Sequence, residues 1–147
     1  MSKQEKINLV VLAVALAGVA YLGWALFFVP GATASEDALG GLRDNVAKLA
    51  AAMMLGVVAI QNYTNGPLQD ERDRQIKADG TAAAYFALLL MLVVAGVLAR
   101  LPAFGAYLGS RPSGWLEPCL LLCIAVSVAV GGAVRAHRYW RDRRAPE

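Results

Sequence analysis

Long apolar stretches alternate with short polar ones along the chain, four times in all. The apolar stretches cover about residues 7–29, 45–63, 81–99 and 116–135. A helix needs about 20 mostly apolar residues to cross the hydrocarbon core of a bilayer, and in lipid its backbone must be hydrogen-bonded within the segment. The pattern therefore predicts an all-α fold: an integral membrane four-helix bundle, formed by residues 1–147 as a single transmembrane domain with short connections.

The first apolar stretch has two interpretations. Lys3 and Lys6 precede it, and Ala32-Thr33-Ala34 after it resembles a signal-peptidase site. The uncharged run of residues 7–29 is, however, longer than the apolar part of a signal peptide, which covers about 7–15 residues. We favour a retained span.

The polar connections predict where the chain leaves the membrane. Residues 31–43 are rich in small and acidic residues and predict an exposed loop with one short turn at the interface. Residues 64–80 predict a charged loop, residues 101–114 a short exterior turn rich in Gly and Pro, and residues 135–147 a basic tail.

The densest charge in the middle of the chain lies between the second and third spans. Residues 70–79 hold seven charged side chains. Asp70 and Arg74 are four residues apart, as are Asp73 and Lys77, with the acid first in each pair, which is the order that stabilises a helix. The run predicts one or two solvated helical turns leading into the third span.

Basic residues divide unequally between the two sides of the predicted bundle. The side with both termini and the charged loop has ten: Lys3, Lys6, Arg72, Arg74, Lys77, Arg135, Arg138, Arg141, Arg143 and Arg144. The other side has four: Arg43, Lys48, Arg100 and Arg111. Because cytoplasmic loops carry an excess of Lys and Arg, we predict that both termini lie in the cytoplasm.

The composition argues against several classes of protein. With 58% hydrophobic and 17% charged residues, the chain is too apolar for a soluble domain of 147 residues. The net charge of +3 does not indicate nucleic-acid binding, because the basic residues flank apolar spans. We predict instead that the tail faces anionic lipid of the bilayer through Arg135, Arg138, Arg141, Arg143 and Arg144.

Two ionisable residues near span ends are candidates for a transport path. Lys48 is predicted one turn inside the second span, where its ammonium can extend to the headgroups or pair with Asp44. Glu117 opens the fourth span beside Pro118, a position typical of an acid at a helix N-terminus. A carboxylate that couples transport normally lies deeper, so the structural interpretation is favoured for both.

Cys119, Cys123 and His137 are weak candidates for redox chemistry. The cysteines are four residues apart, whereas redox pairs are usually spaced Cys-x-x-Cys, and small buried side chains explain them better. His137 follows the last span among arginines, where a haem would need an axial ligand from another subunit or an open coordination site. We predict no metal and no cofactor.

The run Asp70-Glu71-Arg72-Asp73-Arg74-Gln75-Ile76, followed by Ala82-Ala83-Ala84-Tyr85 and an aliphatic span, resembles a motif of a family of small uncharacterised bacterial membrane proteins. Its members have four predicted spans, an acidic-Glu-Arg motif before the third span and a basic aromatic tail. The resemblance implies a location in the bacterial inner membrane and singles out Asp70, Glu71, Arg72 and Arg74. The chain departs from the pattern at Asp79-Gly80, where the resemblance implies a helix that continues through less disruptive residues, so the departure leaves open whether the third helix is rigid and unbroken.

Three functional hypotheses follow. The first is a non-enzymatic accessory or interaction subunit that presents Asp70, Glu71, Arg72, Asp73 and Arg74 to a membrane or cytoplasmic protein partner, or assembles as a homo-oligomer. The second is a small proton- or cation-coupled transporter or channel-like oligomer with Glu117 or Lys48 in its path. The third is a membrane redox protein.

Overall fold

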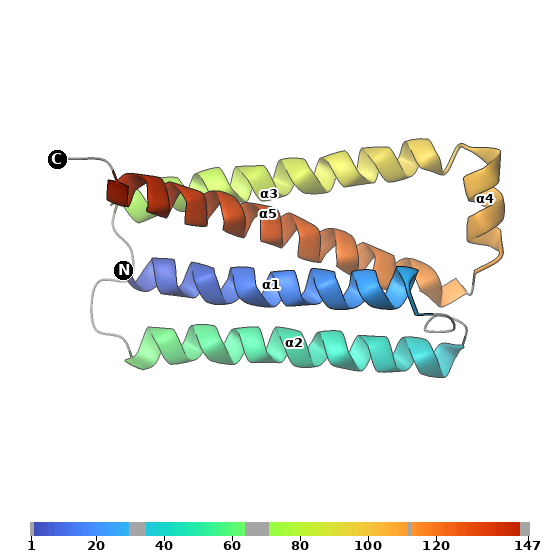
Figure 1. The fold of residues 1–147 in the computed structure, drawn as a ribbon, viewed down its shortest axis with the longest axis horizontal. Coiled ribbons are helices and arrows are strands. Elements are labelled where there is room, and N and C mark those ends of the chain that lie inside the picture. Colours follow the sequence, from blue (N-terminus) through green and yellow to red (C-terminus); the bar gives the residue numbers. More distant parts are fainter. Residues whose placement is uncertain (1, 30–34, 64–70, 112, 145–147) are drawn as a thin grey trace.

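The computed structural model describes residues 2–29, 35–63, 71–111 and 113–144, and nearly all of these are helical (Figure 1). The helices are α1 (Lys3–Phe27), α2 (Glu36–Tyr63), α3 (Glu71–Leu98), α4 (Pro102–Gly109) and α5 (Leu116–Arg144), with a 3-10 turn, η1 (Ser113–Trp115), before α5. The predicted all-α fold is confirmed. Among the described residues, α1, α2, α3 and α5 are long and apolar enough to cross a membrane.

The four long helices lie in a row, in the order α2, α1, α5 and α3, with neighbours antiparallel (Figure 1). Both chain ends lie at the same end of these helices (Figure 1). The main interfaces are those of α1 with α2, α1 with α5 and α3 with α5. In the most apolar parts of α2 and α3, no residue is buried. The predicted bundle is therefore open, because α5 lies between α1 and α3 and leaves α2 and α3 as its two flanks.

Two adjacent glycines of α5 allow this central position. A Cβ atom at Gly131 would lie 2.6 Å from the carbonyl oxygen of Gly80 and 2.9 Å from Cβ of Ala84, both on α3. A Cβ atom at Gly132 would lie 3.2 Å from Leu12 on α1. Helices approach this closely where small residues keep the space between them clear. Gly131 and Gly132 thus bring α3 and α1 to two sides of α5.

Helix α2 begins earlier than predicted, so most of the predicted loop at residues 31–43 that the structure describes is helical. Ser35 caps α2, since its hydroxyl oxygen accepts a hydrogen bond from the N–H of Ala38 at 3.2 Å. Glu36 opens the first turn, where the helix dipole favours an acid. As a result Lys48 lies in the fourth turn of α2, and its predicted place one turn inside the helix is wrong.

Helix α3 begins within the predicted charged loop and is continuous through Asp79 and Gly80. The sequence leaves the continuity of the third helix open at this point, and the structure shows it unbroken, because Gly80 is buried against α5 and tertiary packing outweighs the weak helix propensity of glycine. Most of the predicted tail is also helical, since α5 extends to Arg144. The predicted exterior turn at residues 101–114 contains α4, which starts at Pro102, a residue suited to the first helical position.

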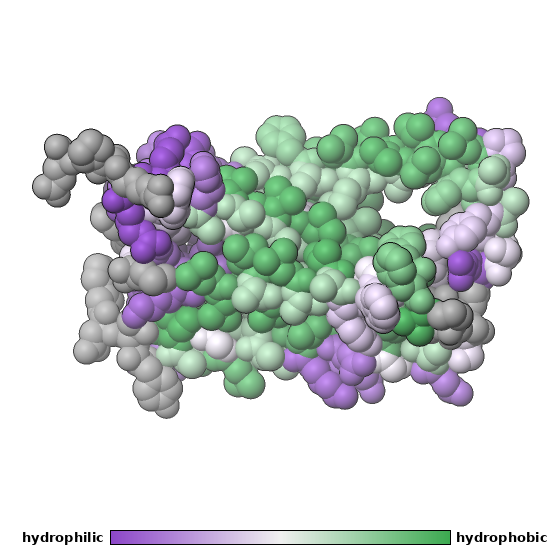
Figure 2. Space-filling model, viewed as in Figure 1, coloured by the Kyte–Doolittle hydropathy of each residue, from purple (hydrophilic) through white to green (hydrophobic). Residues whose placement is uncertain are grey.

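The surface of the molecule has an apolar middle and polar ends. Figure 2 shows hydrophobic residues over the long helices and hydrophilic residues gathered where the chain ends lie. On α3 the exposed side chains include Phe86, Leu90 and Val93. Such an apolar belt is compatible with a helix array that crosses a membrane.

Candidate functional site

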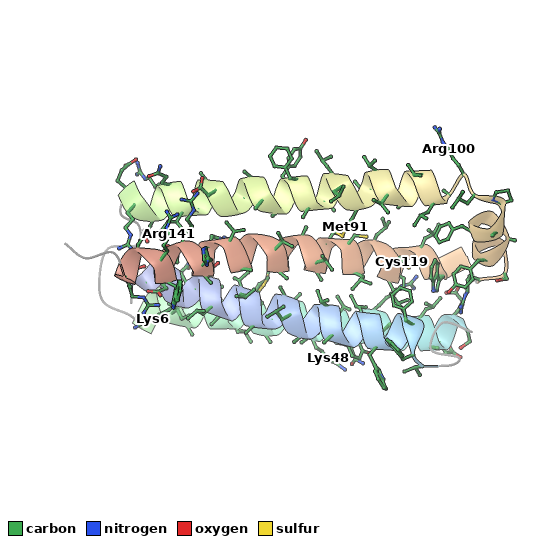
Figure 3. The ribbon with its side chains drawn as sticks, turned by 45° about the horizontal axis from the view of Figure 1, so that its top comes forward. Lys6, Lys48, Met91, Arg100, Cys119 and Arg141 are labelled. Carbon is green, nitrogen blue, oxygen red and sulfur yellow. The ribbon has the colours of Figure 1, made fainter. Side chains whose placement is uncertain are left out.

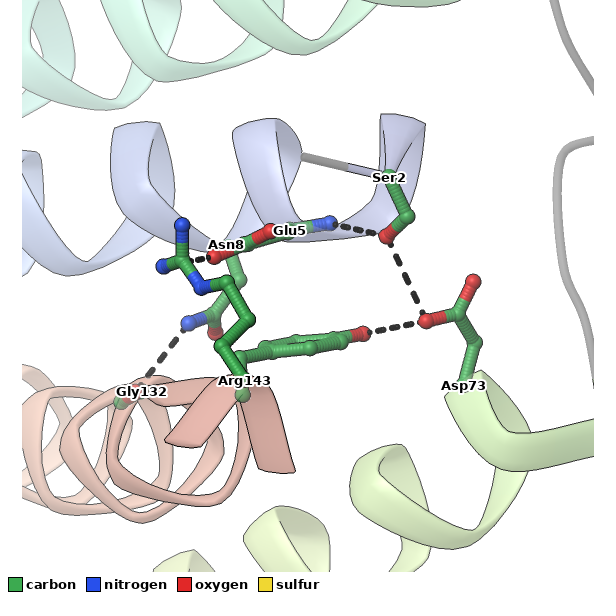
Figure 4. Close-up of polar contacts among 7 residues, drawn as sticks. Ser2, Glu5, Asn8, Asp73, Gly132 and Arg143 are labelled. Atoms are coloured by element: carbon green, nitrogen blue, oxygen red, sulfur yellow. Dashed lines mark hydrogen bonds and ion pairs between the residues drawn. The ribbon is translucent and has the colours of Figure 1, made fainter. Parts of the chain in front are cut away.

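Polar side chains gather where α1 and α3 begin and α5 ends (Figure 4). We call this group the terminal polar cluster. It consists of Ser2, Glu5, Asn8, Asp73, Tyr139 and Arg143. Glu5, Asn8, Asp73 and Tyr139 are all buried, and buried polar groups of this kind are either bonded to one another or costly. The cluster is therefore the first place to look for a function.

Asp73 connects all three helices of the cluster. The hydroxyl group of Tyr139 donates a hydrogen bond to its carboxylate Oδ1 at 2.8 Å, and the hydroxyl group of Ser2 donates to the same oxygen at 3.3 Å. Ser2 also caps α1, since its hydroxyl oxygen accepts from the N–H of Glu5 at 3.1 Å. One carboxylate on α3 thus holds the start of α1 and the end of α5 together.

A second carboxylate, that of Glu5, is paired with Arg143. The guanidinium Nη2 lies 2.5 Å from Glu5 Oε1, and the Glu5 side chain is 7% exposed while that of Arg143 is 55% exposed. A carboxylate buried to this degree needs a partner, because leaving it unpaired costs several kcal/mol. Arg143 therefore covers the buried acid from the solvent side and attaches the last turn of α5 to the first turn of α1.

Asn8 lies one turn deeper along α1. Its side-chain N–H donates to the carbonyl oxygen of Gly132 at 3.1 Å, while its own Oδ1 is buried with no hydrogen-bond partner among the described residues. The bond joins α1 to α5 at the position where Gly132 brings their backbones together. An amide in this setting fixes which residues of the two helices face each other.

Ion pairs continue the connection between α3 and α5. Arg72 Nε lies 3.1 Å from Asp142 Oδ2, and Arg138 Nη2 lies 3.1 Å from Asp79 Oδ2. Arg135 donates to the carbonyl oxygen of Gly131 on its own helix at 3.1 Å. The charged run and the basic tail, which the sequence analysis treated as two separate surfaces, lie against each other.

The predicted interaction residues are divided by the fold. Asp73 is buried in the cluster, whereas Glu71, Arg72 and Arg74 are exposed. Arg74 Nη1 lies 3.6 Å from Glu71 Oε2 on the solvent side. Asp70 lies outside the described residues. One side of the helix that carries the motif therefore packs against α1 and α5, and the other side is exposed on the surface.

The predicted lipid-facing arginines are also divided. Arg138 and Arg143 pair with acids of other helices, and Arg135 packs against Gly80. Arg141 Nε lies 3.9 Å from the neighbouring Asp142 on an exposed surface. Arg144 is the last residue of α5, and its side chain lies outside the described ones.

The transport candidates lie away from the terminal polar cluster, Glu117 at the start of α5 and Lys48 level with the middle of α1. Glu117 Oε2 lies 2.5 Å from Arg43 Nη2, with both side chains about half exposed. Lys48 lines an open groove of about 420 Å³ together with Ala17, Tyr21, Asn45 and Leu49. The structure thus gives Glu117 an ion-pair partner, Arg43, and places Lys48 on the surface of α2.

The redox candidates all lie on α5, with Cys119 and Cys123 one turn apart and His137 about 21 Å further along the helix. Cys119 and Cys123 are free thiols on α5, and the ring of His137 stacks on Trp140 with 5.9 Å between centroids. Within the described part of the chain, no group of three or more His, Cys, Asp and Glu side chains has the arrangement of a metal site.

Comparison with models of protein families, with curated proteins and with solved structures found no match to this chain. The resemblance to small bacterial four-span proteins therefore stays a prediction, and the site must be understood from its own residues. Sequence reasoning missed Ser2, Glu5 and Tyr139, which belong to no motif. The one available signal was Asn8, the only strongly polar residue in the first apolar stretch.

Proposed function

We propose that the protein is a multi-pass protein of the bacterial inner membrane, with both termini in the cytoplasm, that acts as a non-enzymatic accessory or interaction subunit. The observation that carries the proposal is the two-sided first part of α3. Asp73, Ile76 and Gly80 are buried there, whereas Arg74 and Lys77 are exposed.

A charged surface held on a fixed helix suits recognition of a protein partner. The buried side of this segment is attached to α1 and α5 through Asp73, so the exposed side has a defined position. Preorganised charges of this kind steer and orient a partner without a large loss of conformational freedom on binding. The terminal polar cluster then serves as the support of the docking surface.

The transport hypothesis has less support from the geometry. Glu117 forms a half-exposed ion pair with Arg43 where α5 starts, and Lys48 is exposed on α2. A proton or cation path through a membrane protein is lined by ionisable groups that face the interior of the helix array. We therefore do not propose transport, and flux in proteoliposomes that is lost in a Glu117→Gln variant would reverse this choice.

The proposed function is tested by placing a photo-crosslinking amino acid at Arg74 or Lys77 in cells. We expect a discrete adduct with another polypeptide at each of these positions. The adduct formed from one position should be lost when the charge at the other position, Arg74 or Lys77, is reversed. The matched control is Arg100, also an exposed basic position, which follows the other end of α3 and where no such adduct is expected. Absence of any adduct at Arg74 and Lys77, with normal insertion, would overturn the proposal.

The orientation is tested separately by labelling single cysteines from outside the cell in a Cys119→Ala, Cys123→Ala background. Lys77→Cys should be protected and Ser110→Cys labelled, because the two positions lie toward opposite ends of the long helices. The reverse pattern would place the termini outside.

A further inference from the structure

We infer that the outward face of α2 binds the same face of α2 in a second copy of this chain. In this contact Lys48 of each copy pairs with Asp44 of the other copy. The inference rests on the proposed membrane placement. It names a partner surface that lies within the membrane and is distinct from the charged start of α3.

The outward face of α2 is defined by the side that packs on α1. Asn45 donates to the hydroxyl of Tyr21 at 2.7 Å, and a Cβ atom at Gly56 would lie 2.9 Å from Val10, so this side faces α1. A turn of about 100° per residue then places a stripe of exposed residues on one flank of α2, about 60–160° around the helix from Asn45, with Lys48 at the edge of the stripe nearest to α1. The stripe consists of Asp44, Ala47, Lys48, Ala51, Leu55 and Val58.

Lys48 lies near the middle of the membrane-crossing part of the protein. It lines a groove with Ala17 of α1, and the next residue of α1, Gly18, would contact Ala125 of α5 with a Cβ atom at 3.9 Å. Ala125 is about 12 Å along α5 from Glu117 and about 15 Å from Arg135, at 1.5 Å per residue. Lys48 is therefore close to half-way between the charged ends of α5.

The charges of the stripe are not satisfied within the described chain. Neither Asp44 nor Lys48 forms an ion pair or hydrogen bond with another described side chain, and the Asp44–Lys48 pair that the sequence suggested is not made. Figure 3 shows Lys48 pointing away from the helix array, and Figure 2 shows a hydrophilic patch along the α2 edge of the apolar surface. The four-carbon stem of a lysine is too short to carry its ammonium from this depth to headgroups about 12 Å away.

A second copy fits this pattern because the pattern is self-complementary. Copies enter the membrane in one direction, so a two-fold axis along the membrane normal makes the two α2 helices parallel. Asp44 and Lys48 are about 6 Å apart along the helix, and packed helices have axes about 8–10 Å apart. Lys48 of each copy can then reach the partner's Asp44, so the pair forms twice.

The apolar residues of the stripe favour the same contact. Ala47 and Ala51 are four residues apart, the small-xxx-small spacing that lets two membrane helices approach closely. The other flank lacks this combination, since the exposed residues of α3 at mid-depth include Phe86, Leu90 and Val93 with no charge between them. That face suits lipid, whereas the face of α2 suits a partner with the same charges in the same order.

The contact is tested first by disulfide formation in native membranes, in the Cys119→Ala, Cys123→Ala background. Ala51→Cys should form a covalent dimer on mild oxidation, while Val93→Cys, an exposed control on α3, should not. A monomeric Ala51→Cys protein, a dimer through Val93→Cys alone, or an Ala51→Cys adduct with a different polypeptide only would each overturn the inference.

The charge pairing is tested by energy transfer between labelled copies in liposomes. Asp44→Lys and Lys48→Asp each place two like charges at the contact, so each variant alone should lose dimer affinity by at least about tenfold. The two variants mixed should recover it, since each acid of one then faces a lysine of the other. Equal affinity of all four samples, or no recovery in the mixture of correctly inserted variants, would refute the pairing. Adducts at Arg74 and Lys77 do not depend on these residues, so the inference and the proposed function can fail independently.

Discussion

Replacing Gly131 by alanine should push α5 away from α3. The added Cβ atom would lie 2.6 Å from the carbonyl oxygen of Gly80, whereas ordinary contact begins at 3.4 Å. The obstacle is a backbone atom inside a continuous helix, which cannot rotate away as a side chain can. The two helices must therefore separate by roughly 0.8 Å, and the surrounding packing must move with them.

The size of the effect follows from two opposing contributions. Overpacking a close contact costs about 1–3 kcal/mol, and a backbone obstacle places Gly131→Ala in the upper half of that range. Alanine also favours the helix over glycine by about 1 kcal/mol. Gly96→Ala on α3 is the matched control, because a Cβ atom there meets nothing within 4 Å and gains only the helix propensity. The difference between the two variants isolates the overpacking cost, about 2–3 kcal/mol.

The measurement is reversible unfolding in mixed micelles with increasing SDS, followed by tryptophan fluorescence. We expect Gly131→Ala to lower the free energy of unfolding and Gly96→Ala to raise it slightly. A difference of about 2–3 kcal/mol corresponds to a change of roughly 30- to 150-fold in the unfolding equilibrium constant. Equal stabilisation of both variants would show that α3 and α5 do not approach each other at Gly131, and the placement of α5 in the centre would be refuted.

Three further changes test the polar contacts. Arg143→Met should lower the free energy of unfolding by about 1–3 kcal/mol, because it leaves the buried Glu5 carboxylate unpaired. Adding Glu5→Gln should restore most of the lost stability. A double variant no more stable than Arg143→Met alone would contradict the pairing. Tyr139→Phe should cost about 1–2 kcal/mol in the same assay through the lost bond to Asp73, and an unchanged stability would exclude that bond. Glu117→Gln should change stability by less than about 1 kcal/mol, since its ion pair is half exposed, and a larger loss would mean that the pair is buried.

The fold class was predictable because it depends on the length and apolarity of segments, which the sequence displays directly. The helix starts were less predictable, since Ser35 and the acid after it begin α2 within a stretch whose small and polar residues also suit a loop. The continuity of α3 at Gly80 was not predictable for a different reason. The low helix propensity of this glycine is a local property, whereas the contact with α5 that keeps it helical joins residues far apart in the sequence.

Of the residues in the candidate site, the sequence pointed to Asp73 but not to the groups that bind it. The charged run drew attention to Asp73 through its composition, but Tyr139 and Ser2, which bind its carboxylate, are 66 and 71 residues away from it along the chain. The neighbour order of the helices decides such contacts, and that order depends on which small residues face each other. Four apolar stretches are compatible with several orders, so the sequence pattern alone does not bring these three residues together.

The charges at one end of the long helices and those near the middle of α2 differ in whether the fold pairs them. At the end with both termini, Glu5 and Asp79 pair with arginines of α5, so these charges stabilise the helix row. In the proposed membrane placement Lys48 lies near mid-depth, with Asp44 about 6 Å along the helix from it, and neither has such a partner in the described chain, although an isolated charge is least favourable at mid-depth. The polar groups that are paired within the chain thus stabilise the helix row. Asp44 and Lys48, which are not paired within it and lie beside small residues on α2, support the inferred assembly of two copies.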